Sequence, residues 1–267
     1  MVSRKFGFVL AAFALSALPT WSQNSEQLQV GPPPLHRVEP PRPGSTRDEL
    51  DARGDELRTE KNFLDALEFY QAAVKLDPNN SSLYNKEGIC QLMMQRFKDA
   101  KRSFEHAIKA DRKHADAYNN LGVIYYQEKN YRKAIKQYEK AIELRDDAAS
   151  YFSNLGAAYF GKKEFAKAGL AYAKALSIDP DIFERTSRAG VMAQLPSPED
   201  RAHYDYVLAK LYAKSGANDR SLHYLRKAME DGYKDIRDVY KDSEFTELRK
   251  DPRFAELMAA KPPAIND

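Results

Sequence analysis

The sequence lacks the features of a disulfide-stapled domain and of a nucleic-acid-binding protein. Cys90 is the only cysteine, so no intramolecular disulfide can form and stability must come from packing. The 42 basic and 39 acidic residues nearly cancel and are interspersed, whereas a nucleic-acid binder normally shows a basic face or arm. We therefore expect no nucleic-acid partner. Because 43% of the residues are apolar, the chain can build a core, which excludes global disorder.

The usual catalytic patterns are also missing. We find no phosphate-binding loop, nucleophile elbow or metal-ligand spacing. The histidines follow no ligand spacing: His36, His106, His114, His203 and His223. No histidine adjoins Cys90, which we interpret as a small buried apolar side chain. We predict no catalytic residue, no metal, no cofactor and no enzyme activity; the alternative, an enzyme, would need a site hidden in residues 183–201.

The one long apolar run lies at the N-terminus and is short for a membrane span. Arg4 and Lys5 precede "FGFVLAAFALSALPTW", which Pro19 interrupts before it reaches the ~20 residues that a spanning helix needs. We interpret residues 1–22 as a secretory signal peptide cleaved before Gln23, which predicts an exported protein, periplasmic or secreted. The alternative is an uncleaved amino-terminal anchor, and only then do we expect contact with a membrane.

Proline dominates the next segment. Residues 23–46 include "VGPPPLHRVEPPRPG", in which proline removes backbone donors and favours an extended chain, so we predict a disordered proline-rich linker. Residues 37–43 also match a ligand for proline-binding grooves, and this alternative stays open. At the other end of the chain, residues 261–267 are predicted to be a disordered tail.

A period of 34 residues begins after the linker. One register holds Gly54, Gly88, Gly122 and Gly156. A second register holds Ala66, Ala100, Ala134 and Ala168. A third holds large rings, namely Tyr70, Phe104, Tyr138 and Tyr172. A strict period of this length indicates a solenoid of stacked units, in which the glycines and alanines let neighbouring helices pack closely.

The pattern resembles the tetratricopeptide repeat. The third copy reads Tyr118-x-x-Leu121-Gly122-x-x-Tyr125, with residues at i, i+3, i+4 and i+7 on one helical face. Pro78 and Pro180 follow second helices, which a proline cannot continue. The resemblance implies an all-α fold, a right-handed α-solenoid of helix-turn-helix repeats. Four contiguous repeats are predicted at 47–80, 81–114, 115–148 and 149–182.

The C-terminal third continues the array less regularly. A fifth, degenerate repeat is predicted at 202–235, after an inter-repeat loop at 183–201 in which Ser197 or Pro198 could open the next helix. Residues 236–260 resemble the extension that often ends bacterial arrays of this family. Capping helices are expected there, with four apolar residues covering the last repeat: Phe245, Leu248, Phe254 and Leu257.

The resemblance places a candidate binding face on the concave side of the first helices. The peptide-binding hypothesis names seven residues: Asn85, Ile89, Asn119, Val123, Tyr126, Ser153 and Phe160. Asparagine amides could bond a peptide backbone, and the apolar side chains could receive its side chains. The alternative is that they pack one helix against the next. A clamp for a terminal carboxylate is not expected, since the comparable positions hold Asp51, Asp55, Lys86, Asp116 and Asn120.

The resemblance implies recognition of other proteins. The leading hypothesis is a non-catalytic scaffold or adaptor of the cell envelope, which binds a peptide or protein partner in the groove of the array. The alternative is an accessory structural component of a secretion, pilus or outer-membrane assembly machine. No oligomeric state is predicted.

Overall fold

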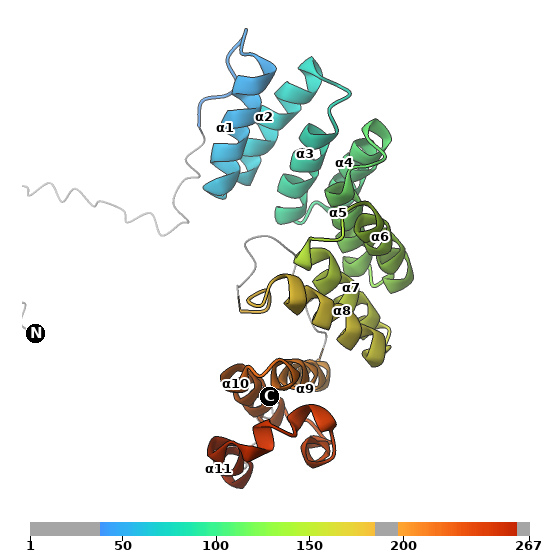
Figure 1. Cartoon of the computed structure of the whole chain (residues 1–267). Helices are drawn as coiled ribbons and strands as arrows, with labels where there is room; N and C mark the ends of the chain where they lie inside the picture. The colour runs from blue at the N-terminus through green and yellow to red at the C-terminus, as the bar shows by residue number, and fades with distance from the viewer. Residues whose placement is uncertain (1–37, 185–196, 261–267) are drawn as a thin grey trace, which may run out of the picture. The chain divides into compact units, whose positions relative to one another are not determined.

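The computed structural model describes residues 38–184 and 197–260, which form helices and turns (Figure 1). The α-helices are α1 (Arg47–Thr59), α2 (Phe63–Leu76), α3 (Ser81–Met93), α4 (Phe97–Ala110), α5 (Ala115–Gln127), α6 (Tyr131–Leu144), α7 (Ala149–Gly161), α8 (Phe165–Ile178), α9 (Pro198–Lys214), α10 (Asn218–Glu230) and α11 (Pro252–Ala260). The predicted signal peptide at 1–22, most of the linker and of the 183–201 loop, and the tail at 261–267 lie outside the described residues.

The helices pack in series as antiparallel pairs. Each of the first four predicted repeats contains one pair, from α1 with α2 to α7 with α8 (Figure 1). The closest packing lies within a pair, and the second helix of each of the first three pairs then contacts the first helix of the next. This arrangement confirms the predicted all-α solenoid. None of the described helices is both long and apolar enough to cross a membrane.

A residue with left-handed backbone geometry follows the end of each first helix. The φ angles of Lys61, Gln95, Lys129 and Lys163 lie between 56° and 65°, and Gly216 takes the equivalent place with φ 76°. The following N–H groups reach back over the turn, as in the 2.8 Å bond from Asn62 to the Leu57 carbonyl. This is the Schellman hydrogen bond, which satisfies a terminal carbonyl and turns the chain into the second helix.

The glycine register lies against the aromatic register. A Cβ atom on Gly88 would lie 2.5 Å from Cε1 of Phe104, and one on Gly122 would lie 2.5 Å from Cε1 of Tyr138. A side chain therefore has no room at these positions, because the ring of the paired helix fills the space. The alanine register is fully buried in the same interface: Ala66, Ala100, Ala134 and Ala168.

The fifth pair is covered by the C-terminal segment. Ser197 caps α9 by accepting a hydrogen bond from the Asp200 N–H, and the helix begins at Pro198. After α10 the chain forms three 3₁₀ turns and then α11, in the segment where capping helices were expected. The four predicted capping side chains are buried in one core with α9 and α10: Phe245, Leu248, Phe254 and Leu257. They shield an apolar face that no further repeat covers.

Candidate functional site

The seven residues of the peptide-binding hypothesis all lie on first helices. Asn85 and Ile89 belong to α3, Asn119, Val123 and Tyr126 to α5, and Ser153 and Phe160 to α7. They occupy equivalent positions of the 34-residue period, and α5 contacts both α3 and α7. The fold therefore brings them onto one face, which we call the first-helix face.

Asparagine side chains join the repeats along the first-helix face. Asn120 Nδ2 donates to Asn85 Oδ1 at 2.9 Å, and Asn154 Nδ2 donates to Asn119 Oδ1 at 3.0 Å. Asn119 Nδ2 donates in turn to Asn120 Oδ1 at 3.2 Å. These bonds make one ladder across α3, α5 and α7. The amide oxygens of Asn85 and Asn119 are therefore hydrogen-bonded within the array, as in the alternative that the sequence left open.

The ladder contains two residues that the sequence argument did not assign to the site. Asn120 and Asn154 stand 35 residues after Asn85 and Asn119, one more than the repeat period. A 35-residue spacing between asparagines could have predicted these contacts from the sequence. A side chain one position beyond the repeat period can reach back to the preceding first helix. Lys86 makes the equivalent contact, 35 residues after Asp51.

The apolar members of the first-helix face are mostly covered by protein. Val123, Tyr126 and Phe160 expose 2%, 7% and 2% of their surfaces. Because neighbouring side chains cover them, they offer almost no surface for the side chains of a peptide. Ile89 and Ser153 are only half-buried and keep accessible surface. These two positions keep surface that a partner could contact.

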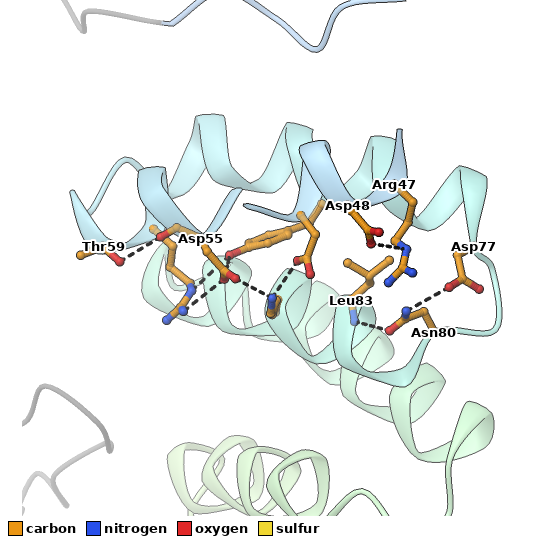
Figure 2. Close-up of polar contacts among 11 residues, drawn as sticks. Arg47, Asp48, Asp55, Thr59, Asp77, Asn80 and Leu83 are labelled. Atoms are coloured by element: carbon orange, nitrogen blue, oxygen red, sulfur yellow. Dashed lines mark hydrogen bonds and ion pairs between the residues drawn. The ribbon is translucent and has the colours of Figure 1, made fainter. Parts of the chain in front are cut away.

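A charged cluster joins the first pair to the second (Figure 2). Lys86 Nζ lies 2.7 Å from a carboxylate oxygen of Asp51 and 2.7 Å from one of Asp55. Tyr70 also donates to Asp55, at 2.8 Å. Burial acts to raise the pKa of Asp55, but hydrogen bonds from Lys86, Tyr70 and Arg58 outweigh it and lower that pKa. Lys86 is thus engaged by two aspartates and is not a free anchor for a carboxylate ligand.

Ser81 and His114 form the contact that most resembles a catalytic pair. Ser81 Oγ lies 2.5 Å from His114 Nδ1, but the hydroxyl donates to the Ala107 carbonyl at 2.9 Å. Since the hydroxyl has one proton, Nδ1 of His114 must donate to Ser81. A ring nitrogen that carries the proton cannot act as the base for this serine. Burial lowers the pKa of His114, so the ring is neutral at pH 7. The pair joins α3 and α4 to the start of α5.

Aromatic and charged contacts connect the fourth and fifth pairs. The His203 ring on α9 lies 3.9 Å from the Phe165 ring on α8, between ring centroids. Burial lowers the pKa of His203. On the same helix, Tyr206 donates to Asp242 at 2.8 Å, and Lys210 lies 2.9 Å from the same carboxylate. These contacts hold α9 between α8 and the first 3₁₀ turns of the C-terminal segment.

The described residues hold neither a cluster of metal ligands nor a reactive thiol. Within residues 38–184 and 197–260, no three histidine, cysteine, aspartate or glutamate side chains gather as metal ligands would. Cys90 is fully buried, as predicted, and burial raises the pKa of its thiol to about 12. A thiol with this pKa stays protonated at neutral pH and is a poor nucleophile.

Sequence models of the tetratricopeptide repeat match three overlapping or adjacent parts of the chain. They cover residues 57–121, 115–147 and 149–182. Residues 57–147 and 149–182 thus carry the sequence pattern of tetratricopeptide repeats. The match agrees with the helix pairs of the structure and with the motif in the third repeat. A search of curated proteins found no match to the chain.

Several solved structures are similar in fold to this chain. PilF of Pseudomonas aeruginosa is 19% identical with a TM-score of 0.53, over 80% of this chain and 88% of that one. A thermophilic TPR protein of Thermus thermophilus is also 19% identical, with a TM-score of 0.50, over 80% of this chain and 100% of that one. MamA is 27% identical with a TM-score of 0.47, over 67% of this chain and 93% of that one. The first two support the repeat fold.

Proposed function

We propose that this protein is a non-catalytic scaffold that holds a protein or peptide partner against its first-helix face. The observation that carries the proposal is the unbroken register of α1, α3, α5 and α7, whose equivalent positions line up along the array. A row of regularly spaced positions on a rigid support suits an extended or helical peptide, which offers side chains at regular intervals.

Two residues of the first-helix face support contact with such a partner. Ile89 offers an apolar, partly accessible side chain, and Ser153 offers a hydroxyl, whereas Val123 and Phe160 are covered. The asparagine ladder fixes the spacing between first helices, so it presents these positions at a constant separation. A pre-formed surface of this kind binds without the entropy cost of ordering itself.

We further propose that the protein is exported in bacteria and works in the cell envelope or outside the cell. Export is supported by the basic, apolar and small-residue pattern of residues 1–22, and a bacterial origin by the resemblance of residues 236–260 to the ends of bacterial arrays.

Site-specific photo-cross-linking in intact cells tests the proposal. A photoreactive residue is placed at Ile89 or Ser153, and at the exposed Ser177 on α8 as the matched control. We expect the first two to capture the same protein from the periplasmic or secreted fraction and the control to capture it weakly. Equal capture from all three positions, or no reproducible capture from positions 89 and 153, would contradict binding at this face.

A further inference from the structure

The turns within three of the repeats carry a positive charge, although basic and acidic residues nearly balance over the whole chain. In an array of antiparallel pairs, the turns inside pairs lie at one edge and the turns between pairs at the other. We define the basic edge as residues 94–102, 128–136 and 162–170, which are equivalent turns of the second, third and fourth pairs. These turns hold eleven lysines and arginines against three acids. The equivalent turn of the first pair, 60–68, holds one lysine and three acids.

The three acids of the basic edge leave more than half of its cations unpaired. Asp99 pairs with Arg96 and Arg102, Glu128 with Lys101, and Glu164 with Lys162 and Lys167. Six exposed cations make no ion pair with any described residue: Lys98, Lys129, Arg132, Lys133, Lys136 and Lys163. Their charge is therefore available to an external anion.

Ring contacts show that cations from successive pairs converge. The ammonium groups of Lys101 on α4 and Lys133 on α6 lie 4.6 Å and 5.4 Å from the centre of the Tyr125 ring. Lys167 on α8 repeats the contact at Tyr159, at 5.4 Å. The second and third turns therefore present their charges side by side, although 34 residues separate them in sequence, and the fourth pair repeats the cation–ring contact within itself.

Exposed apolar side chains accompany these cations. Phe97 is 37% exposed and Leu170 is 73% exposed, and both belong to the basic edge. Leu170 occupies the position that Arg102 and Lys136 hold in the two preceding pairs, so it lies on the same outer face of its helix. Exposed apolar and basic side chains together are typical of surfaces that lie on lipid, with cations at the headgroups and apolar groups inserted below them.

We propose that the basic edge docks this protein on an anionic lipid surface. Cations recur on all three turns, with several positions shared by two successive turns, which suits a laterally extended anionic surface. The exposed leucine favours lipid over the phosphate backbone of a nucleic acid, which offers it no apolar environment. Docking at this edge leaves the first-helix face available for a protein partner, and it requires no anchor in residues 1–22.

Vesicle co-sedimentation of the full chain tests this proposal. The variant Lys98→Gln, Arg132→Gln, Lys136→Gln removes three cations of the basic edge. The control Lys109→Gln, Arg112→Gln, Lys113→Gln removes three exposed cations at the far end of α4 and the turn after it. Helix α4 spans about 20 Å, beyond the Debye length of ~8 Å at physiological salt. Both variants have the same net charge and the same N-terminal segment, so only the position of the cations differs.

We expect the native chain to bind mixed phosphatidylcholine–phosphatidylglycerol vesicles more tightly than pure phosphatidylcholine vesicles. The basic-edge variant should lose about 100-fold in partitioning, since each of its three cations contributes about a factor of five near such a surface. The control should change by less than about threefold. Equal losses in the two variants, equal binding to both kinds of vesicle, or binding to duplex DNA or an acidic peptide without binding to vesicles would overturn the proposal. Circular dichroism of each variant confirms folding.

Discussion

At the scale of single residues, equivalent tyrosines differ in how their hydroxyl groups are satisfied. Tyr70 donates to Asp55, and Arg58 donates to Tyr70 at 3.2 Å. In the fourth pair, Ala157 stands where Asp55 stands in the first, and the buried Tyr172 hydroxyl has no hydrogen-bond partner among the described residues. Burial raises the pKa of Tyr172 far above its ordinary value. In both pairs the ring packs against the first helix. Only in the first pair does the hydroxyl make hydrogen bonds to described residues.

Replacing these two tyrosines should change stability in opposite directions. Tyr172→Phe removes an unpaired buried hydroxyl and should raise the free energy of unfolding by about 1 kcal/mol. Tyr70→Phe leaves Asp55 without one donor and should lower it by about 1 kcal/mol. Urea unfolding followed by circular dichroism measures both. Destabilisation by both changes would show that the Tyr172 hydroxyl has a partner in solution.

At the scale of helices, the α9–α10 pair contains a buried carboxylate. Asp205 on α9 is 4% exposed, and Lys227 Nζ on α10 lies 3.6 Å from it. Burial above all, with the nearby Asp231, raises the pKa of Asp205 to about 6, because Lys227 and Arg201 oppose them only in part. Lys227 is 45% exposed, so solvent screens its charge. At neutral pH the α9–α10 pair therefore contains an ionised carboxylate that its buried surroundings disfavour.

This carboxylate should make stability depend on pH. The folded chain binds the Asp205 proton more tightly than the unfolded chain, whose pKa is near 3.8. The favourable contribution is fully present below pH 3.8 and is lost as pH rises through about 6. Asp205→Asn should therefore raise the free energy of unfolding at pH 7.5 by up to about 3 kcal/mol, and by less at pH 4.5. Urea midpoints at both pH values measure this; an equal gain at both would contradict the linkage.

At the scale of the whole array, polar contacts between first helices couple successive pairs. The charged cluster around Lys86 joins the first two pairs, and the asparagine ladder joins the second to the fourth. Stacked repeats are stabilised mainly by contacts with their neighbours, so these bonds contribute to how cooperatively the array unfolds.

Double-mutant cycles should detect this coupling. Asn85→Ala and Asn119→Ala each remove one partner of Asn120, so their effects on the free energy of unfolding should be non-additive by about 0.5 kcal/mol or more. Asn119→Ala combined with Ser221→Ala on α10 serves as the control, because Ser221 bonds the Ala209 carbonyl in the fifth pair. The control should be additive within about 0.5 kcal/mol. Additivity in both cycles would mean that the ladder does not connect the repeats energetically.

The sequence by itself determined the fold class, because small and aromatic registers at a 34-residue period can be buried only by stacking helix pairs. It also determined where the chain turns, since Pro78 and Pro180 end second helices. Tertiary structure alone decided the rest. Whether Phe160 is a binding residue or a core residue depends on the neighbour that covers it, and here Phe165 and His203 contact its ring. Charges that are interspersed along the chain gather at one edge because antiparallel pairing brings every second turn together, which no local pattern reveals.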